Sequence, residues 1–272
     1  MKRSASLIIG AALVGVVVLA CLVSLVWLPF DPNHVVPSAR LASPGWPHLM
    51  GTDGLGLDIF SRVLAGSRIC LLAGIIAVAI GAIIGVPLGV AGAATGGVWG
   101  QVIMRAADLV YAFPALLLAI LLAAARGGGS VATAMVAIGI ASVPAFIRIA
   151  RGASLQVLSQ DYVLAARAAG TTRARIAWSH VLPNIAPVVL VQSSVSFGLA
   201  ILAEAALSYL GLSAPATTPA WGRMLYDAQP YLFSDPNLAT WPGLAIAVAV
   251  LGFNLLGDGL RDVLDPTLRE VR

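Results

Sequence analysis

Charge is scarce in this sequence. Only 10% of its 272 residues are charged, while 59% are hydrophobic, and typical soluble domains carry about 25% charged residues. A water-soluble fold of this length would need more polar surface than such a composition supplies. The shortage of charge therefore excludes an ordinary soluble protein and makes a lipid bilayer the expected solvent for most of the chain.

The sequence also lacks the motifs of an enzyme. It has no P-loop for phosphate binding, no GxSxG elbow and no paired-histidine metal motif. Cys21 and Cys70 lie in or beside apolar runs and predict neither a disulfide framework nor a metal site. His34 and His48 have no second ligand at a suitable spacing. We therefore expect no catalytic residue, no bound metal and no directly bound cofactor.

What the sequence does have is a series of long apolar runs. Each is close to or above the ~17–25 residues that a helix needs to cross about 30 Å of hydrocarbon, and no alternating strand pattern competes. We predict an all-α membrane protein with six transmembrane helices. The runs are Leu7–Leu28, Ile69–Ala94, Val102–Ala125, Val131–Ile147, Ile185–Leu212 and Trp241–Gly257.

The basic residues predict an orientation, because cytoplasmic loops carry an excess of Lys and Arg. With the N-terminus inside, six crossings return the C-terminus to the same side. The cytoplasmic set is then Lys2, Arg3, Arg105, Arg148, Arg151, Arg167, Arg173, Arg175, Arg261, Arg269 and Arg272, and the outer set is Arg40, Arg62, Arg68, Arg126 and Arg223. This imbalance predicts that both termini are cytoplasmic.

Two features are expected around the second run. A Pro- and Gly-rich outer segment precedes it and should end in a short amphipathic helix over about Asp58–Ala65, lying at the membrane surface. Within the run, Gly81, Gly85 and Gly89 recur at four-residue steps, a spacing that lets another helix approach closely in lipid. Ordinary helix packing and a moving helix are both compatible with this pattern.

The apolar runs contain few polar residues. Arg105 and Asp108 are three residues apart and should share a helix face, as an ion pair near the inner boundary or as part of a substrate site. Pro114 should bend the helix about two turns later. Glu204 is an acid deep in an apolar run, where a charge costs about 2.5–3.5 kcal/mol at mid-bilayer. We expect it to face the bundle or a wet cavity, as an anchor or a pathway residue.

A polar stretch, "DYVLAARAAGTTRARIAWSHVLPN", separates the apolar runs at residues 161–184. We expect one helix from about Ser154 to Ala169, a left-handed cap at Gly170, and a second helix through about His180, capped by Thr171 or Thr172. Pro183 should mark the exit into the next span.

One side of the first helix should present small and aromatic residues, namely Leu158, Tyr162, Ala165, Ala166 and Ala169. A DNA-binding helix-turn-helix is disfavoured, because three arginines face one aspartate without a wider basic surface. A plain loop of this length is uncommon. A docking element for a cytoplasmic protein fits best.

This stretch resembles the "EAA" loop of ATP-binding-cassette importer permeases. Ala165-Ala166 are followed by three residues, Gly170, nine residues, His180, Val181 and Leu182-Pro183, and this spacing matches the family pattern throughout. Leu164 replaces the family's acid, and His180 replaces its isoleucine.

Other segments resemble the dipeptide/oligopeptide (and nickel) branch, and specifically its C-type subunit. They are "MGTDGLGLDIFSRVLAGSR", in which Leu57 stands where an arginine is usual, "MRAADLVYAFPALLLAI", "AILAEAALSYLGLS", "WGRMLYDAQ" and "PGLAIAVAVLGFNLLGDGLRDVLDPTLR". Together they span nearly the whole chain.

The resemblance implies a type I importer permease fold and a prokaryotic inner-membrane location. Its implied partners are a homologous second permease subunit in a heterodimer, two cytoplasmic ATPase subunits (or one fused ATPase) carrying ATP and Mg²⁺, an extracytoplasmic solute-binding protein and the lipid bilayer, with no nucleic acid. The substrate would be a di- or oligopeptide. Nickel or another small ligand is the alternative.

The resemblance also implies a division of the chain. Residues 1–66 would form a first span plus an outer segment, residues 67–260 the permease core with a coupling loop at about 154–184, and residues 261–272 a cytoplasmic tail. The ATPase-coupling residues would be Tyr162, Leu164, Ala165, Ala166, Ala169, Gly170, His180, Leu182 and Pro183. An ion-gradient transporter is the alternative of another class, but it predicts several ionisable groups at mid-bilayer and an internal repeat.

Overall fold

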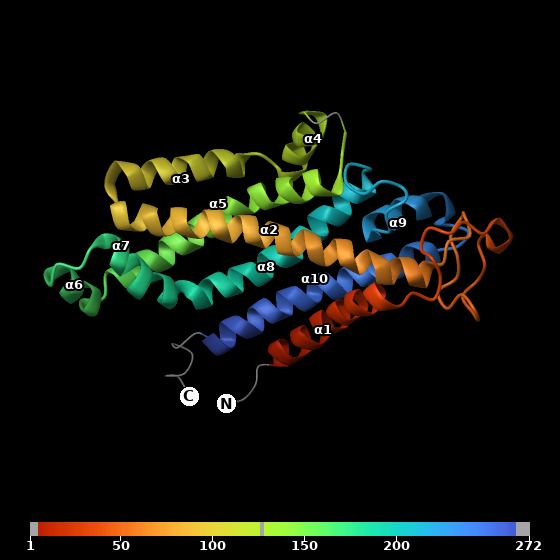
Figure 1. Ribbon diagram of the computed structural model, residues 1–272, viewed down its shortest axis with the longest axis horizontal. Coiled ribbons are helices and arrows are strands. Elements are labelled where there is room, and N and C mark those ends of the chain that lie inside the picture. The colour runs from red at the N-terminus through yellow and green to blue at the C-terminus, as the bar shows by residue number, and fades with distance from the viewer. Residues whose placement is uncertain (1–4, 126–127, 265–272) are drawn as a thin grey trace.

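The computed structural model describes residues 5–125 and 128–264, and within these ranges all of the regular structure is helical (Figure 1). The α-helices are α1 (Ala5–Val26), α2 (Ile59–Thr95), α3 (Gly97–Ala112), α4 (Ala115–Ala125), α5 (Val131–Leu158), α6 (Asp161–Ala168), α7 (Arg173–Ile176), α8 (Leu182–Tyr209), α9 (Trp221–Ala228) and α10 (Asn237–Leu264). Short turns of 3₁₀ helix occupy Pro37–Ala39 and Gln229–Tyr231, and a π turn occupies Ala177–Val181. The predicted all-α class is confirmed.

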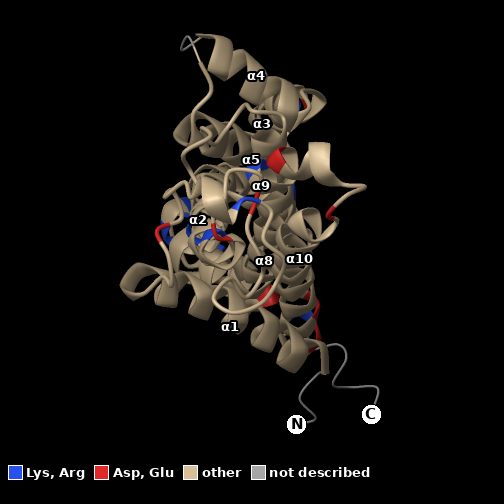
Figure 2. Ribbon diagram, turned by 90° about the vertical axis from the view of Figure 1, so that its right-hand side faces the viewer, with Lys and Arg blue, Asp and Glu red and all other residues tan. Residues whose placement is uncertain are grey.

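Five helices among the described residues are long and apolar enough to cross a membrane, and a sixth span results if the bent pair α3–α4 counts as one. Four of these helices, α2, α5, α8 and α10, run along the long axis of Figure 1. Helix α1 lies on one side of them, and α3 and α4 lie on the other. Charged residues are sparse along these helices (Figure 2). The architecture is that of a multi-pass helical membrane protein.

The third span is broken. The expectation was one span over Val102–Ala125 that bends at Pro114; the bend lies at the predicted place, but it is an 81° break that divides the span into α3 and α4. Phe113 takes an extended backbone, with φ −86° and ψ 119°. The ring of Pro114 disfavours helical geometry at the residue before it, so the proline ends α3 instead of merely bending one continuous helix.

The short surface helix expected over about Asp58–Ala65 is also wrong as a separate element. These residues are the N-cap and first turns of α2, which continues to Thr95 as one helix. Asp58 caps the helix by accepting a hydrogen bond from the Ser61 backbone N at 2.7 Å. Ile59 and Ser61, which lie on nearly opposite sides of this turn, are 2% and 0% exposed. Protein therefore covers both faces of this turn, so it does not lie as a separate helix at the membrane surface.

The glycines that recur every four residues along α2, at positions 81, 85 and 89, form a stripe that packs against α5. A methyl group at Gly85 would lie 2.5 Å from Phe146 Cβ and 2.8 Å from the Val143 carbonyl oxygen, and one at Gly89 would lie 2.6 Å from the Ile147 carbonyl oxygen. Two helix backbones can approach this closely only where side chains are absent. The predicted close-packing role of this stripe is confirmed.

Figure 1 shows how the ends of the bundle differ. The loop after α1, the start of α2 and α9 gather at one end, while the α6–α7 hairpin projects from the other. The first turns of α1 pack against the last turns of α10, with Gly259 against the backbone of Leu7. The described ends of the chain therefore lie toward the hairpin end.

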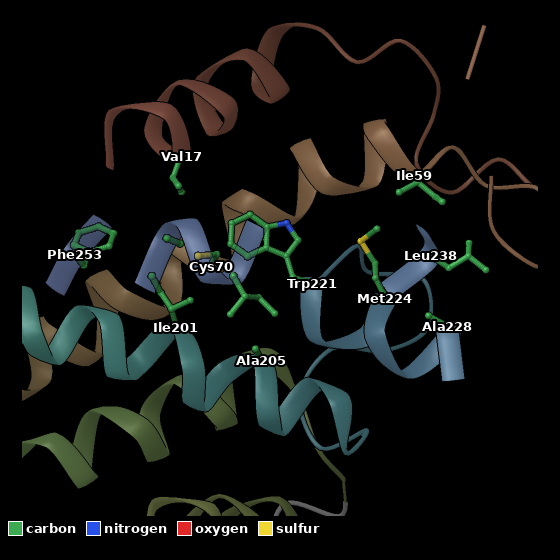
Figure 3. Close-up of a cluster of buried hydrophobic side chains, with 12 residues drawn as sticks. Val17, Ile59, Cys70, Ile201, Ala205, Trp221, Met224, Ala228, Leu238 and Phe253 are labelled. Atoms are coloured by element: carbon green, nitrogen blue, oxygen red, sulfur yellow. The ribbon is translucent and has the colours of Figure 1, made fainter. Parts of the chain in front are cut away.

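A buried cluster anchors α9 to the spans at the end opposite the hairpin (Figure 3). Trp221 is 4% exposed, lies near Cys70 and Ala205, and donates a hydrogen bond from Nε1 to the Val63 carbonyl oxygen at 2.9 Å. Phe197 and Phe253 stack with their ring centroids 3.9 Å apart. Helices α2, α8, α9 and α10 are thereby fixed to one another.

Candidate functional site

Residues 161–184 form an exposed hairpin between α5 and α8, at one end of the bundle (Figure 1). The single helix expected over about Ser154–Ala169 is wrong, because α5 ends at Leu158 and α6 begins at Asp161. Ser159 Oγ donates to the Gln156 carbonyl oxygen at 2.9 Å, and serine side chains that bond nearby backbone in this way compete with helix continuation. Leu158 is buried in the bundle and does not belong to the exposed face.

The turn at Gly170 has the geometry predicted from the sequence. Gly170 has φ +81°, its N–H donates to the Arg167 carbonyl oxygen at 2.9 Å, and the Thr171 N–H donates to the Ala166 carbonyl oxygen at 3.0 Å. This pair of bonds is the Schellman motif, which needs a left-handed residue at this position and therefore favours glycine. Thr172 then caps α7 by accepting from the Arg175 N–H at 3.4 Å.

The second half of the hairpin leads into α8 without a break. Pro183 lies in the first turn of α8 and so marks the entry into this span, as predicted, while a π turn over Ala177–Val181 joins α7 to α8. Pro183 has no N–H to donate to the preceding turn. The side-chain amide of Asn184 donates a hydrogen bond to the His180 carbonyl oxygen at 2.6 Å.

Three apolar side chains seat the hairpin on the bundle. Val163, Ile176 and Val181 are 0%, 2% and 0% exposed and belong to one buried cluster with residues of α2 and α5. Sequence reasoning did not single them out. The alternation of these positions with alanines and arginines was the available signal, but it does not show which side of so short a helix is covered.

The predicted coupling residues fall into three groups. Leu164, Ala165 and Ala169 are exposed on the outer side, whereas Ala166 is half-buried. Tyr162 and His180, from the two halves of the hairpin, lie edge to face with their ring centroids 5.9 Å apart. Leu182 is half-buried and Pro183 exposed, both at the start of α8. The structure thus brings most of these residues to one projecting element.

The ion pair expected between Arg105 and Asp108 is wrong. Asp108 pairs with Arg148 of α5 at 2.9 Å instead, and the Arg148 guanidinium also lies 4.3 Å from the centre of the Tyr111 ring. Asp108 lies within reach of the neighbouring helix, while Arg105 stays exposed on α3. Helix spacing alone could not show that a partner on α5 would compete.

Glu204 faces the bundle, as predicted. It is 3% exposed, and Ser213 Oγ donates to its Oε1 at 3.3 Å. The structure does not bring it together with Arg105 or Asp108. This arrangement fits a polar anchor that ties α8 to the loop after it.

Sequence reasoning missed an ionic network at the end opposite the hairpin. Arg62 of α2 bonds Asp53 at 2.8 Å and lies 3.7 Å from Asp227 of α9, which also pairs with Arg223 at 3.0 Å. Burial raises the pKa of Asp227, although Arg223 and Arg62 act in the opposite direction. The network fastens the loop after α1, together with α9, to the start of α2. No local pattern relates Arg62 to Asp227, which lie far apart in the chain.

These observations define a multi-pass helical membrane protein with a capped hairpin projecting between two of its spans. Residues 81–270 match the family described as "Binding-protein-dependent transport system inner membrane component". The chain belongs to this family, and is a permease subunit of such a transport system.

Curated relatives agree with this assignment. The chain is 42% identical over 243 residues to the glutathione transport system permease protein GsiD of Pectobacterium atrosepticum, covering 89% of this chain and 80% of that one. It is 38% identical over 269 residues to the dipeptide transport system permease protein DppC of Alkalihalophilus pseudofirmus, covering 99% and 88%. It is 40% identical over 267 residues to the probable D,D-dipeptide transport system permease protein DdpC of Escherichia coli, covering 98% and 89%.

A solved structure agrees in fold. A chain of the MetNI methionine ABC transporter in an inward-facing conformation matches with a TM-score of 0.63 over 75% of this chain and 96% of that chain, at 17% sequence identity. At this identity the likeness shows the fold alone.

Proposed function

We propose that this protein is the permease subunit of an ATP-driven importer of short peptides and forms half of its translocation pathway. Relatives at about 40% identity, which are named for the transport of glutathione, dipeptides and D,D-dipeptides, support this substrate class. A second, homologous permease would supply the other half, and a solute-binding protein would deliver the peptide at the end that carries α9.

The observation that carries the proposal is the exposed, capped hairpin between α5 and α8. In the proposed orientation it lies in the cytoplasm with both termini and docks in a cleft of an ATPase subunit. ATP and Mg²⁺ bind to that partner, because this chain's sequence has no phosphate-binding loop. Two ATPase subunits, or one fused ATPase, complete the assembly.

The connections of the hairpin support its use as a lever. The π turn joins α7 to α8 without a gap, so a displacement of the docked hairpin would pass directly into that span. On the other side, Ser159 and Gln160 separate α5 from α6 and leave a short non-helical link. Closure of the ATPases would therefore pull α8 and let α5 swivel, which would change the access of the pathway from one side to the other.

Purification of the intact assembly in mild detergent, followed by mass spectrometry of its subunits and ligands, tests this proposal. We expect a second permease, an ATP-binding-cassette ATPase and a peptide retained by a solute-binding protein. A purified assembly without an ATPase would overturn the proposal. Ala165→Trp, at an exposed position of α6, should lower recovery of the ATPase, whereas Gly152→Ala, at an open position on α5, should not.

A further inference from the structure

We propose that the ATPase cleft that receives the α6–α7 hairpin has an apolar floor facing Leu164 and an acidic rim facing Arg167, Arg173 and Arg175. This inference rests on the proposed function, since it gives the chemistry of the ATPase partner. The exposed surface of the hairpin carries it.

One apolar part of that surface lies on the outer side of α6, and the exposed Trp178 of the π turn forms another. Leu164 is 48% exposed, and Ala165 and Ala168 beside it are exposed as well. Residues three and four apart on a helix are neighbours, so Leu164 and Ala168 adjoin each other, and both point away from the side that buries Val163. A leucine among alanines on a projecting helix offers a partner one protruding apolar contact and no hydrogen-bonding group. A matching cleft should therefore be apolar where Leu164 enters.

The arginine part flanks the turn at Gly170. Arg167 lies in the last turn of α6, and Arg173 and Arg175 lie in α7. All three are exposed, and none of them forms an ion pair with another residue of the described ranges. Asp161 is the hairpin's one acid. Guanidinium groups bind carboxylates with paired hydrogen bonds, so the unused donors favour an anionic partner.

Depth along α5 decides between an acidic protein and an anionic lipid surface. The apolar run of α5 ends at Ile147, before Arg148, and the helix continues for another eleven residues to Leu158. At 1.5 Å per residue this extension is about 16 Å long, whereas the headgroup layer on each side of the hydrocarbon is only about 5–7 Å thick. The hairpin follows Leu158 and therefore projects past the lipid headgroups. The anionic partner is accordingly a protein.

The test uses the complete permease pair in nanodiscs and its purified partner ATPase. Leu164→Glu should weaken ATPase binding by about tenfold or more, since it brings a charge against an apolar floor. Its control is Leu232→Glu, the same change at a leucine of similar exposure that follows the Gln229–Tyr231 turn at the opposite end of the bundle. The double charge reversal Arg167→Glu/Arg173→Glu should weaken binding by at least about tenfold and reduce its sensitivity to salt. Arg261→Glu, at the end of α10, is its control.

The outcomes separate this proposal from the proposed function. If the unaltered permease binds the ATPase, but Leu164→Glu and the charge reversal bind equally well, the cleft chemistry is wrong and the proposed function stands. If the unaltered permease binds no ATPase, the proposed function itself is wrong. If the charge reversal leaves ATPase binding intact and instead lowers binding to vesicles containing anionic phospholipid, the arginines serve a membrane and the proposal is overturned. Thermal unfolding of each variant shows that the exposed substitutions leave the fold intact.

Discussion

The ring of Tyr162 meets the ring of His180 edge to face, with 5.9 Å between the centroids. Tyr162 lies in the first turn of α6, and His180 lies in the π turn that leads into α8. The hairpin is therefore closed by a side-chain contact in addition to the backbone turn at Gly170. The contact holds α6 to the same stretch of chain that continues into a membrane span.

Removal of the contact between Tyr162 and His180 should make the hairpin less rigid and weaken its binding to the ATPase. Aromatic pairs of this geometry contribute about 0.5–1.5 kcal/mol beyond their buried area, so Tyr162→Ala and His180→Ala should each weaken ATPase binding, and the double variant should lose less than the sum. A double-mutant cycle on ATPase affinity measures the coupling energy. Tyr162→Phe keeps the ring and serves as the control. Fully additive losses would show that the two rings act independently.

Gly170→Pro should uncouple transport and leave membrane insertion intact. The residue needs φ +81°, whereas proline is fixed near −65°, and the substitution also removes the N–H that bonds Arg167. The hairpin should then lose its closed shape while the spans remain.

Peptide uptake by proteoliposomes containing the full assembly measures this effect, and the amount of permease in the membrane controls for insertion. Gly152→Ala, a helical glycine with open space around it, should transport normally. Normal uptake by Gly170→Pro would contradict the lever mechanism.

Gly85→Ala should destabilise the contact between α2 and α5 by about 1–3 kcal/mol, the range for overpacking. The added methyl group would meet Phe146 Cβ and the backbone at Val143, and backbone cannot move aside as a flexible side chain can. Gly15→Ala, on α1 with nothing within 4 Å, is the matched control and should be neutral. Thermal unfolding in detergent compares the two variants. Equal unfolding temperatures would argue against tight packing at Gly85.

Asp227 should make the stability of the protein depend on pH. Burial raises its pKa above the ordinary value of 3.8, so its contribution to stability is fully present below pH 3.8 and is lost as the pH rises through the raised pKa. The stability of the unaltered protein relative to Asp227→Asn should therefore fall with rising pH over that window. Thermal unfolding of both proteins across a pH series measures this difference. A difference that grows with pH would show that the ion pairs with Arg223 and Arg62 outweigh burial.

The features that could be predicted from the sequence are those set by residues close together in the chain. Apolar run lengths identified the spans, and the Gly170 cap followed from a glycine placed after a run of helix-forming residues. The four-residue glycine steps of α2 indicated a closely packed face, although they did not show that α5 covers it.

Two of the errors share a physical cause, which is that contacts between distant segments decided the outcome. Asp108 pairs with Arg148 on another helix. The loop after α1 and helix α9 cover the first turn of α2, where Arg62 lies close to Asp227. Pro114 and Pro183 were placed correctly by local rules, since one lies at the break of the third span and the other in the first turn of α8.

The central claim is that ATP hydrolysis by a partner, acting through the hairpin, drives uptake. Uptake of a labelled dipeptide by proteoliposomes containing both permeases, the ATPase and the binding protein tests it most directly, with and without ATP and with ion gradients collapsed. We predict uptake that requires ATP, persists without ion gradients and is lost in Gly170→Pro while ATP hydrolysis continues. Uptake that runs on an ion gradient without ATP would contradict the account.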